Sequence, residues 1–204
     1  MTHRHCEGAY LYEQTTTDGE NEMKAATPNR LARLRRPLPD DLYPIALELG
    51  VRIGLRPSRL QTLRDVARYH DIGKCAIPAA ILAKPAALDE REREFVREHP
   101  GIGARMLMAS AYTVELAPLV RSTHERWDGS GYPNRLRGEE IPLESRIVAI
   151  CDAYVAMTSA RPFRATKTEE EALSEIARHA GTQFDPALAQ EFQMMMSAST
   201  QRVA

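Results

Sequence analysis

Apolar residues recur three or four positions apart along most of the chain from Pro39 onward, as on one face of a helix. This spacing predicts one helix that begins after Asp40 and ends at Gly54, and a second that ends at Gly73. It predicts further helices over residues 89–99, 102–107, 116–124, 147–157, 169–179 and 186–195. No segment shows the alternation of a strand, so the predicted fold is all-α.

Polar residues indicate where two of these helices begin. Ser58 and Gln61 have the spacing of a capping box, in which each side chain accepts a hydrogen bond from the other residue's main chain. Asp89 is the expected cap of a charged helix whose Phe95 and Val96 would face inward.

The chain divides into one domain with two short flanking segments. Residues 1–37 are polar and without periodicity, which predicts a disordered or loosely attached leader. The predicted domain spans residues 38–197, and residues 198–204 are a predicted C-terminal tail.

Composition argues against binding of duplex nucleic acid and against a membrane span, and it indicates a cellular compartment. The 204 residues are 43% hydrophobic and 27% charged with a net charge of −1, so no broad basic field for duplex nucleic acid is expected. No apolar run approaches the ~20 residues that a membrane span requires. The cysteines Cys6, Cys75 and Cys151 match neither a disulfide framework nor a zinc ribbon, which favours the cytoplasm.

The segment His70-Asp71-Ile72-Gly73-Lys74 carries the strongest chemical signal. An imidazole and a carboxylate side by side can both bind a divalent metal, and the ammonium of Lys74 suits a phosphate oxygen. Metal and lysine together indicate hydrolysis of a phosphate ester. A His-Asp pair is more often a surface or capping pair, but His70 continues the apolar face of its predicted helix and so points inward.

Three more residues of the ligand type follow at or near the ends of predicted helices: His99, His124 and Asp152. Each has an ordinary explanation. His99 could interact with a helix dipole, His124 could be a half-buried histidine, and Asp152 could pair with an arginine. Together with His70 and Asp71, they favour a shared metal site.

With these residues in these positions, the sequence resembles the HD-GYP family, a branch of the HD metal-dependent phosphohydrolases. The resemblance covers residues 40–195, and its most specific part is the loop Asp128-Gly129-Ser130-Gly131-Tyr132-Pro133. The matching segments are residues 70–74, 77–107, 123–154, 159–164 and 184–186. The fold implied by the resemblance is an HD-domain helical bundle with a long Gly/Pro-containing GYP loop.

The resemblance implies hydrolysis of cyclic di-GMP, a bacterial second messenger, at a site with two divalent ions, iron or manganese. It implies metal-ligand roles for His70, Asp71, His99, His124 and Asp152. It implies catalytic roles for Asp71, which would bridge the ions, and Lys74. The implied substrate contacts are Lys74, Arg126, Gly131, Tyr132 and Pro133, with Arg137 a further phosphate candidate. The loop is also linked in this family to partner signalling domains.

This chain departs from the family pattern at three positions. Thr123 replaces the first of two successive histidines, Leu38 stands where many members have a histidine, and Val155 replaces a second aspartate. The resemblance therefore leaves one ion with His70, Asp71 and Asp152.

The other ion keeps Asp71, His99 and His124. A partly depleted site predicts weak hydrolysis. Two alternatives stay open: a cyclic di-GMP receptor or partner-binding scaffold without turnover, and an HD phosphohydrolase for another nucleotide. The sequence does not give the oligomeric state.

Overall fold

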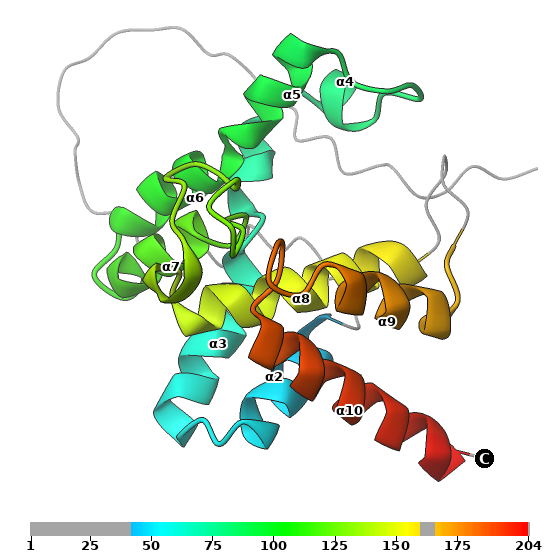
Figure 1. Ribbon diagram of the computed structural model, residues 1–204. Helices are drawn as coiled ribbons and strands as arrows, with labels where there is room; N and C mark the ends of the chain where they lie inside the picture. Colours follow the sequence, from blue (N-terminus) through cyan, green and yellow to red (C-terminus); the bar gives the residue numbers. More distant parts are fainter. Residues whose placement is uncertain (1–41, 160–165, 204) are drawn as a thin grey trace, which may run out of the picture.

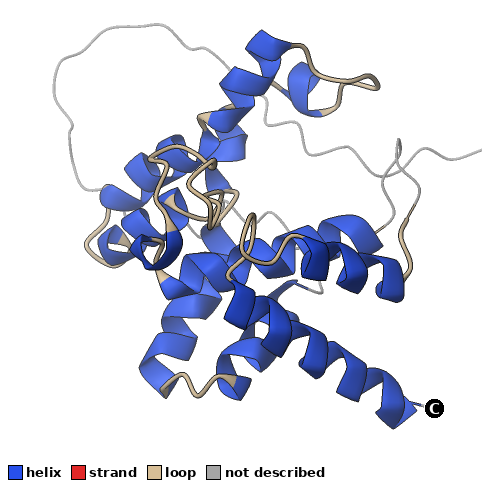
Figure 2. Ribbon diagram, viewed as in Figure 1, coloured by secondary structure: helices blue, strands red, loops and turns tan. Residues whose placement is uncertain are grey.

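The computed structural model describes residues 42–159 and 166–203, and every regular element in these ranges is a helix (Figures 1 and 2). The predicted all-α fold is confirmed. The only β-type pairing within the described ranges is an isolated bridge between Ala180 and Phe184. The predicted leader, residues 1–37, lies outside the described residues.

The α-helices are α2 (Leu42–Arg52), α3 (Pro57–Tyr69), α4 (Ala79–Leu82), α5 (Glu90–Arg97), α6 (His99–Met108), α7 (Ala117–Arg121), α8 (Leu143–Thr158), α9 (Glu169–Arg178) and α10 (Pro186–Val203). Three short 3₁₀ helices join them: η1 (Ile72–Ala76), η2 (Val114–Leu116) and η3 (Gly138–Glu140).

Helix α8 is the centre of the bundle. It packs against α2, α3, α7, α9 and α10, and it crosses the middle of the molecule in Figure 1. Nine of its residues are buried, including Ile147 and Ile150. Leu49 of α2, Leu63 of α3 and Phe192 of α10 are fully buried in the same core. The helix that carries Asp152 is therefore held from several sides.

The helix boundaries follow most of the expected signals. Gly54 follows α2 with φ 78°, a conformation that suits glycine at a helix end. Asp89 accepts a hydrogen bond from the main chain of Glu92 and closes the expected cap of α5. The Ser58 capping box is wrong. Pro57 occupies the first turn of α3, and its fixed φ starts the helix without a side-chain cap.

Helices α4 and α5 extend away from the rest of the bundle at the top of Figure 1, and among the described helices α5 packs mainly against α6. Phe95 is consequently 40% exposed, so the inward orientation predicted for it is wrong. Val96 is half-buried. Periodicity predicts an apolar side of α5, but it does not show whether another described helix packs against that side.

Helix α10 continues through Val203, so the helix passes the boundary that the sequence analysis places at residue 197. In the portion of the chain that is described, no helix has the length and apolar character needed to cross a bilayer.

Truncation of the core at α8 tests this packing. Ile147→Ala removes a fully buried side chain, and we expect it to lower the free energy of unfolding by about 2–5 kcal/mol. Val51→Ala removes a side chain that is 62% exposed, and we expect a change within about 0.5 kcal/mol. Urea unfolding measures both. Equal losses would show that α8 is not the centre of the core.

Candidate metal centre

His70 and Asp71 occupy the junction between α3 and η1. His70 follows the last residue of α3, and Asp71 precedes η1 with φ −105°. Gly73 lets η1 approach α6, because a Cβ at this position would overlap the carbonyl oxygen of His99. The glycine thus brings the His-Asp pair next to the start of α6.

The other three candidate ligands come from separate elements. His99 is the first residue of α6, and Asp152 lies in α8. His124 does not extend a helix as predicted, because α7 ends at Arg121 and the chain turns before reaching it. The turn allows the imidazole to face the other ligands, which a continued helix would not guarantee.

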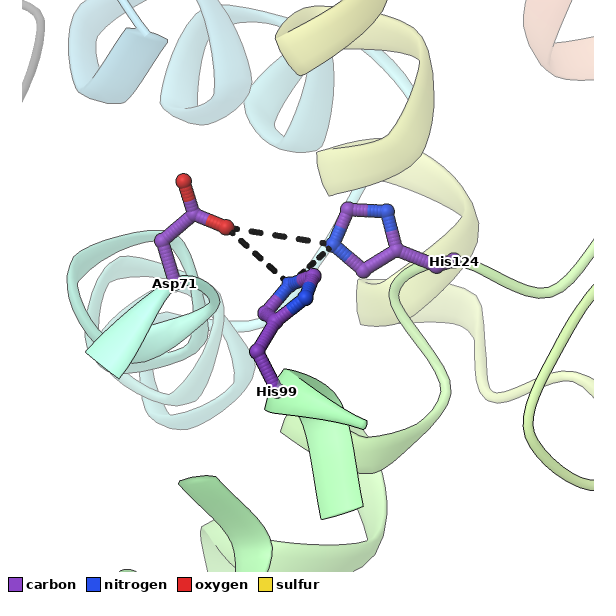
Figure 3. Close-up of side chains that lie close together, drawn as sticks. All are labelled: Asp71, His99 and His124. Carbon is purple, nitrogen blue, oxygen red and sulfur yellow. Dashed lines mark hydrogen bonds and ion pairs between the residues drawn. The ribbon is translucent and has the colours of Figure 1, made fainter. Parts of the chain in front are cut away.

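Asp71, His99 and His124 form a compact cluster (Figure 3). Asp71 Oδ1 lies 3.2 Å from His99 Nε2 and 3.9 Å from His124 Nε2. The two Nε2 atoms are 2.9 Å apart. One ligand atom from each residue falls within 4.8 Å of the other two, a spacing suited to one metal ion.

The remaining two candidates, His70 and Asp152, lie close to each other near the other oxygen of Asp71. His70 Nε2 lies 3.6 Å from Asp71 Oδ2 and 3.7 Å from Asp152 Oδ1. Lys74 Nζ approaches the same Asp71 Oδ2 at 2.6 Å. The two oxygens of Asp71 therefore face different groups, and all five candidate ligands are connected through this carboxylate.

Main-chain carbonyls orient two of the imidazoles. His70 Nδ1 lies 2.8 Å from Ala67 O, and His99 Nδ1 lies 2.7 Å from Val96 O. A carbonyl can only accept, so each Nδ1 carries a hydrogen, and Nε2 is the ring nitrogen directed toward the Asp71 carboxylate.

The electrostatics of the cluster favour an ionised Asp71. Burial opposes ionisation, but the nearby imidazoles of His124 and His99 and the charges of His70 and Lys74 hold the pKa of Asp71 well below its usual range. Burial also lowers the pKa of His124, and the Asp71 carboxylate does not fully offset it, so this ring is held neutral.

His70 and Asp152 stabilise each other in charged form. Burial disfavours the imidazolium, yet the nearby carboxylates of Asp152 and Asp71 raise the pKa of His70. Burial likewise opposes ionisation of Asp152, and the contact with His70 outweighs it and lowers the pKa of Asp152.

The cluster fits a divalent cation. Asp71 Oδ1 is a buried carboxylate oxygen that has no hydrogen-bond partner among the described residues, which is costly. It faces the Nε2 atoms of His99 and His124. A cation between these three atoms would satisfy them together, and nitrogen and oxygen donors of this kind suit iron, manganese or zinc. The main-chain carbonyls that orient the rings are the partners expected behind metal-binding histidines.

The loop with the sequence Gly131-Tyr132-Pro133 lies directly against the cluster. The Tyr132 ring stacks on the His124 ring with centroids 5.4 Å apart, and its main-chain N–H donates to His124 O. A Cβ on Gly131 would overlap the main chain of Glu125 and Arg126, so only glycine fits. The buried Glu125 carboxylate accepts hydrogen bonds from two loop N–H groups, which fixes the loop.

A cavity of about 480 Å³ opens beside this loop. Its lining residues are Arg97, Gly129, Ser130, Gly131, Tyr132, Pro133 and Arg135. The lining contains the three predicted loop contacts but not Arg126, whose guanidinium donates to Ser130 Oγ. Arg137 donates to the carbonyl of Asp128 and likewise supports the loop.

Sequence reasoning missed Arg97 and Arg135 as candidate functional residues. Arg97 stands two positions before His99, and that proximity was the only available signal. Nothing in the spacing distinguished Arg135 from Arg126 and Arg137, because the direction of each side chain depends on the loop conformation.

Two of the family departures have structural roles here. The buried Thr123 hydroxyl donates to Val120 O, and Val155 lies in the hydrophobic core. Neither belongs to the cluster. Leu38, the third departure, lies outside the described residues.

Comparison with known proteins identifies the family of this chain. The sequence model of the HD domain family matches residues 19–188. The cyclic di-GMP phosphodiesterase response regulator RpfG of Xanthomonas campestris is 35% identical over 190 residues, which cover 87% of this chain and 50% of the relative. A 3'3'-cGAMP-specific phosphodiesterase of Vibrio cholerae, number 2, is 38% identical over 137 residues, or 66% of this chain and 26% of the relative.

A solved structure shares the fold. The crystal structure of a cyclic GMP-AMP-specific phosphodiesterase of V. cholerae, V-cGAP3, aligns with a TM-score of 0.61 at 21% identity, over 81% of this chain and 45% of that one. The HD-domain fold expected from the sequence is confirmed. The chain spans half the length of RpfG, and less of the others.

Neutralising the shared carboxylate tests the cluster as a metal centre. Asp71→Asn removes the charge that faces both groups of candidate ligands, and we expect bound Mn²⁺, measured by equilibrium dialysis, to fall at least tenfold. Asp65→Asn on the exposed face of α3 is the matched control and should retain wild-type binding. Undiminished Mn²⁺ binding by Asp71→Asn would remove this residue from the site.

Proposed function

We propose that this chain, which belongs to the HD domain family, is a metal-dependent phosphodiesterase that hydrolyses cyclic di-GMP. The observation that carries the proposal is the buried Asp71–His99–His124 cluster, with Lys74 and the loop cavity beside it. The name of RpfG, which states cyclic di-GMP phosphodiesterase activity, supports the choice of substrate.

The proposed cofactor is a pair of iron or manganese ions. Asp71, His99 and His124 would hold one, and His70, Asp71 and Asp152 would hold the other. When bound, such ions make a nucleophilic oxygen available near neutral pH and offset the charge on phosphorus. The two oxygens of Asp71 lie near different imidazoles, Oδ1 near His99 and Oδ2 near His70, and this supports the proposed bridging role.

The chain's own residues would bind and orient the phosphodiester. Lys74 is about a quarter exposed and carries an ammonium next to the cluster, so it can turn from Asp71 to a substrate phosphate oxygen. Tyr132 closes one side of the cluster by stacking on His124 and would limit how the substrate enters. Gly131 and Pro133 shape the same wall.

Two other functions have specific support. The thin donor sets, with Thr123 engaged elsewhere, favour a receptor that binds cyclic di-GMP without turnover and presents the loop to a signalling domain. The name of the Vibrio cholerae relative favours another cyclic dinucleotide, 3'3'-cGAMP, as the substrate. Cytoplasm remains the proposed compartment, since Cys75 and Cys151 are free thiols.

Turnover assays with both nucleotides separate these functions. We expect cyclic di-GMP hydrolysis that needs added Mn²⁺ or Fe²⁺, stops with a chelator, and is slower than in a family member with every histidine, because each ion lacks a donor. Chromatography of the linear product measures it. Binding without turnover at any metal concentration would establish the receptor function, and preferential cleavage of 3'3'-cGAMP would change the substrate.

Replacement of the lysine tests its proposed contact with phosphate. Lys74→Gln should lower kcat/KM for cyclic di-GMP about 10- to 100-fold while bound Mn²⁺ stays near the wild-type level, because a charge-assisted phosphate contact is lost. Lys84→Gln removes a comparable ion pair, with Glu92, away from the cluster and serves as the control. Loss of bound metal in Lys74→Gln would instead show that Lys74 supports Asp71.

A further inference from the structure

We propose that the cavity beside the loop is a subsite for a second phosphate group, which Arg97 and Arg135 bind. The inference rests on the proposed function. A cyclic dinucleotide carries two phosphodiesters, and only one can be at the metal centre while it is cleaved. The cavity of about 480 Å³ would hold the other.

Both arginines are free to bind an anion. Within the described residues, neither Arg97 nor Arg135 has a carboxylate within ion-pair distance, and both are exposed. Arg93 on the same helix, in contrast, is paired with Glu90. Two uncompensated guanidinium groups lining one cavity repel each other and attract an anion, and their planar donors match phosphate oxygens.

Arg135 has a backbone conformation that needs an explanation. Its φ is 57°, and among the described residues it is the only non-glycine residue with a positive φ. Gly129 and Gly138, in the same loop, adopt positive φ without the strain that a Cβ causes. The exposed Arg135 side chain makes no hydrogen bond within the described structure that would offset this strain. Strain of this kind gathers at ligand sites, and here it coincides with the cavity.

Tyr132 connects the cavity to the metal centre. Its ring stacks on His124, and the guanidinium of Arg97 lies over the same ring, 5.7 Å from its centroid. Since Tyr132 also lines the cavity, one residue separates the two sites. A ligand with two linked phosphates can therefore contact both, whereas a single phosphodiester at the metal centre leaves the cavity unused.

The loop holds this arrangement before any ligand arrives. Glu125 binds the N–H groups of Asn134 and Leu136 on either side of Arg135. The cavity wall does not have to be ordered by the ligand, which reduces the entropic cost of binding.

Two substitutions test the subsite, each with a different structural effect. Arg135→Gly removes the guanidinium and also relieves the positive φ, so its melting temperature should equal or exceed that of the wild type. Arg97→Gln removes the second guanidinium from the end of α5. Arg91 is an exposed arginine of the same helix that does not line the cavity, so Arg91→Gln is the matched control.

Calorimetric titration with chelated metal measures binding apart from turnover. We expect each cavity variant to weaken cyclic di-GMP binding about tenfold, with a shallower salt dependence, while the Arg91→Gln control binds as the wild type does. Cyclic di-AMP, with the same phosphates and different bases, should lose affinity by the same factor. Unchanged affinity in both variants, or no binding of either dinucleotide to the wild type, would overturn the subsite. A loss confined to cyclic di-GMP would overturn it in favour of a guanine contact.

Turnover of a substrate with one phosphodiester separates this inference from the proposed function. With Mn²⁺ present, the cavity variants should lose at least tenfold more kcat/KM toward cyclic di-GMP than toward bis(p-nitrophenyl) phosphate. Equal losses would contradict a second-phosphate subsite. If the wild type hydrolyses neither compound but binding falls in the variants, the proposed function fails and the subsite stands.

Discussion

A single carboxylate connects the two parts of the candidate site. Asp71 directs Oδ1 to His99 and His124, and Oδ2 to His70 and Lys74. A largely buried carboxylate stays ionised only when positive charges or hydrogen-bond donors surround it. The fold supplies these groups from α3, η1, α6, the turn after α7 and, through Asp152, from α8. The packing of these elements around α8 is thus what allows one charge to organise the site.

Local main-chain geometry prepares the imidazoles before any ion is present. His70 and His99 both bind the carbonyl three residues earlier, in Ala67 and Val96 respectively. The same short-range device operates at the end of α3 and at the start of α6, so neither orientation depends on a distant side chain. What the distant contacts supply is proximity. Gly73 permits the approach of η1 to α6, and the loop places Tyr132 against His124.

Helical periodicity was enough to predict most of the fold, because a buried face repeats along each helix whatever it packs against. It placed α2 and α9 closely, whereas α8 begins four residues before the predicted start at residue 147. The orientation of Phe95 in α5 could not be predicted, since periodicity does not show which helix faces are covered by another helix. The five candidate ligands could be selected because each is of a metal-binding type near the end of a predicted helix, and the family resemblance then assigned them to one site. Arg97 and Arg135 could not be selected, because the cavity depends on a loop conformation that has no periodic signal.

The family departures and the geometry together indicate that the two parts of the site are unequal. Thr123 and Val155 are engaged in a main-chain hydrogen bond and in the core, so neither can supply a donor without repacking. Around Asp71 Oδ1, two imidazoles remain with the carboxylate. Around Oδ2, His70 is already paired with Asp152, and that pairing raises the pKa of His70. A cation bound by His70 would have to displace the proton that Asp152 stabilises on that imidazole. The His124 imidazole is held neutral, so no such proton has to leave it. The cluster of Asp71, His99 and His124 is therefore the better prepared of the two to receive a cation.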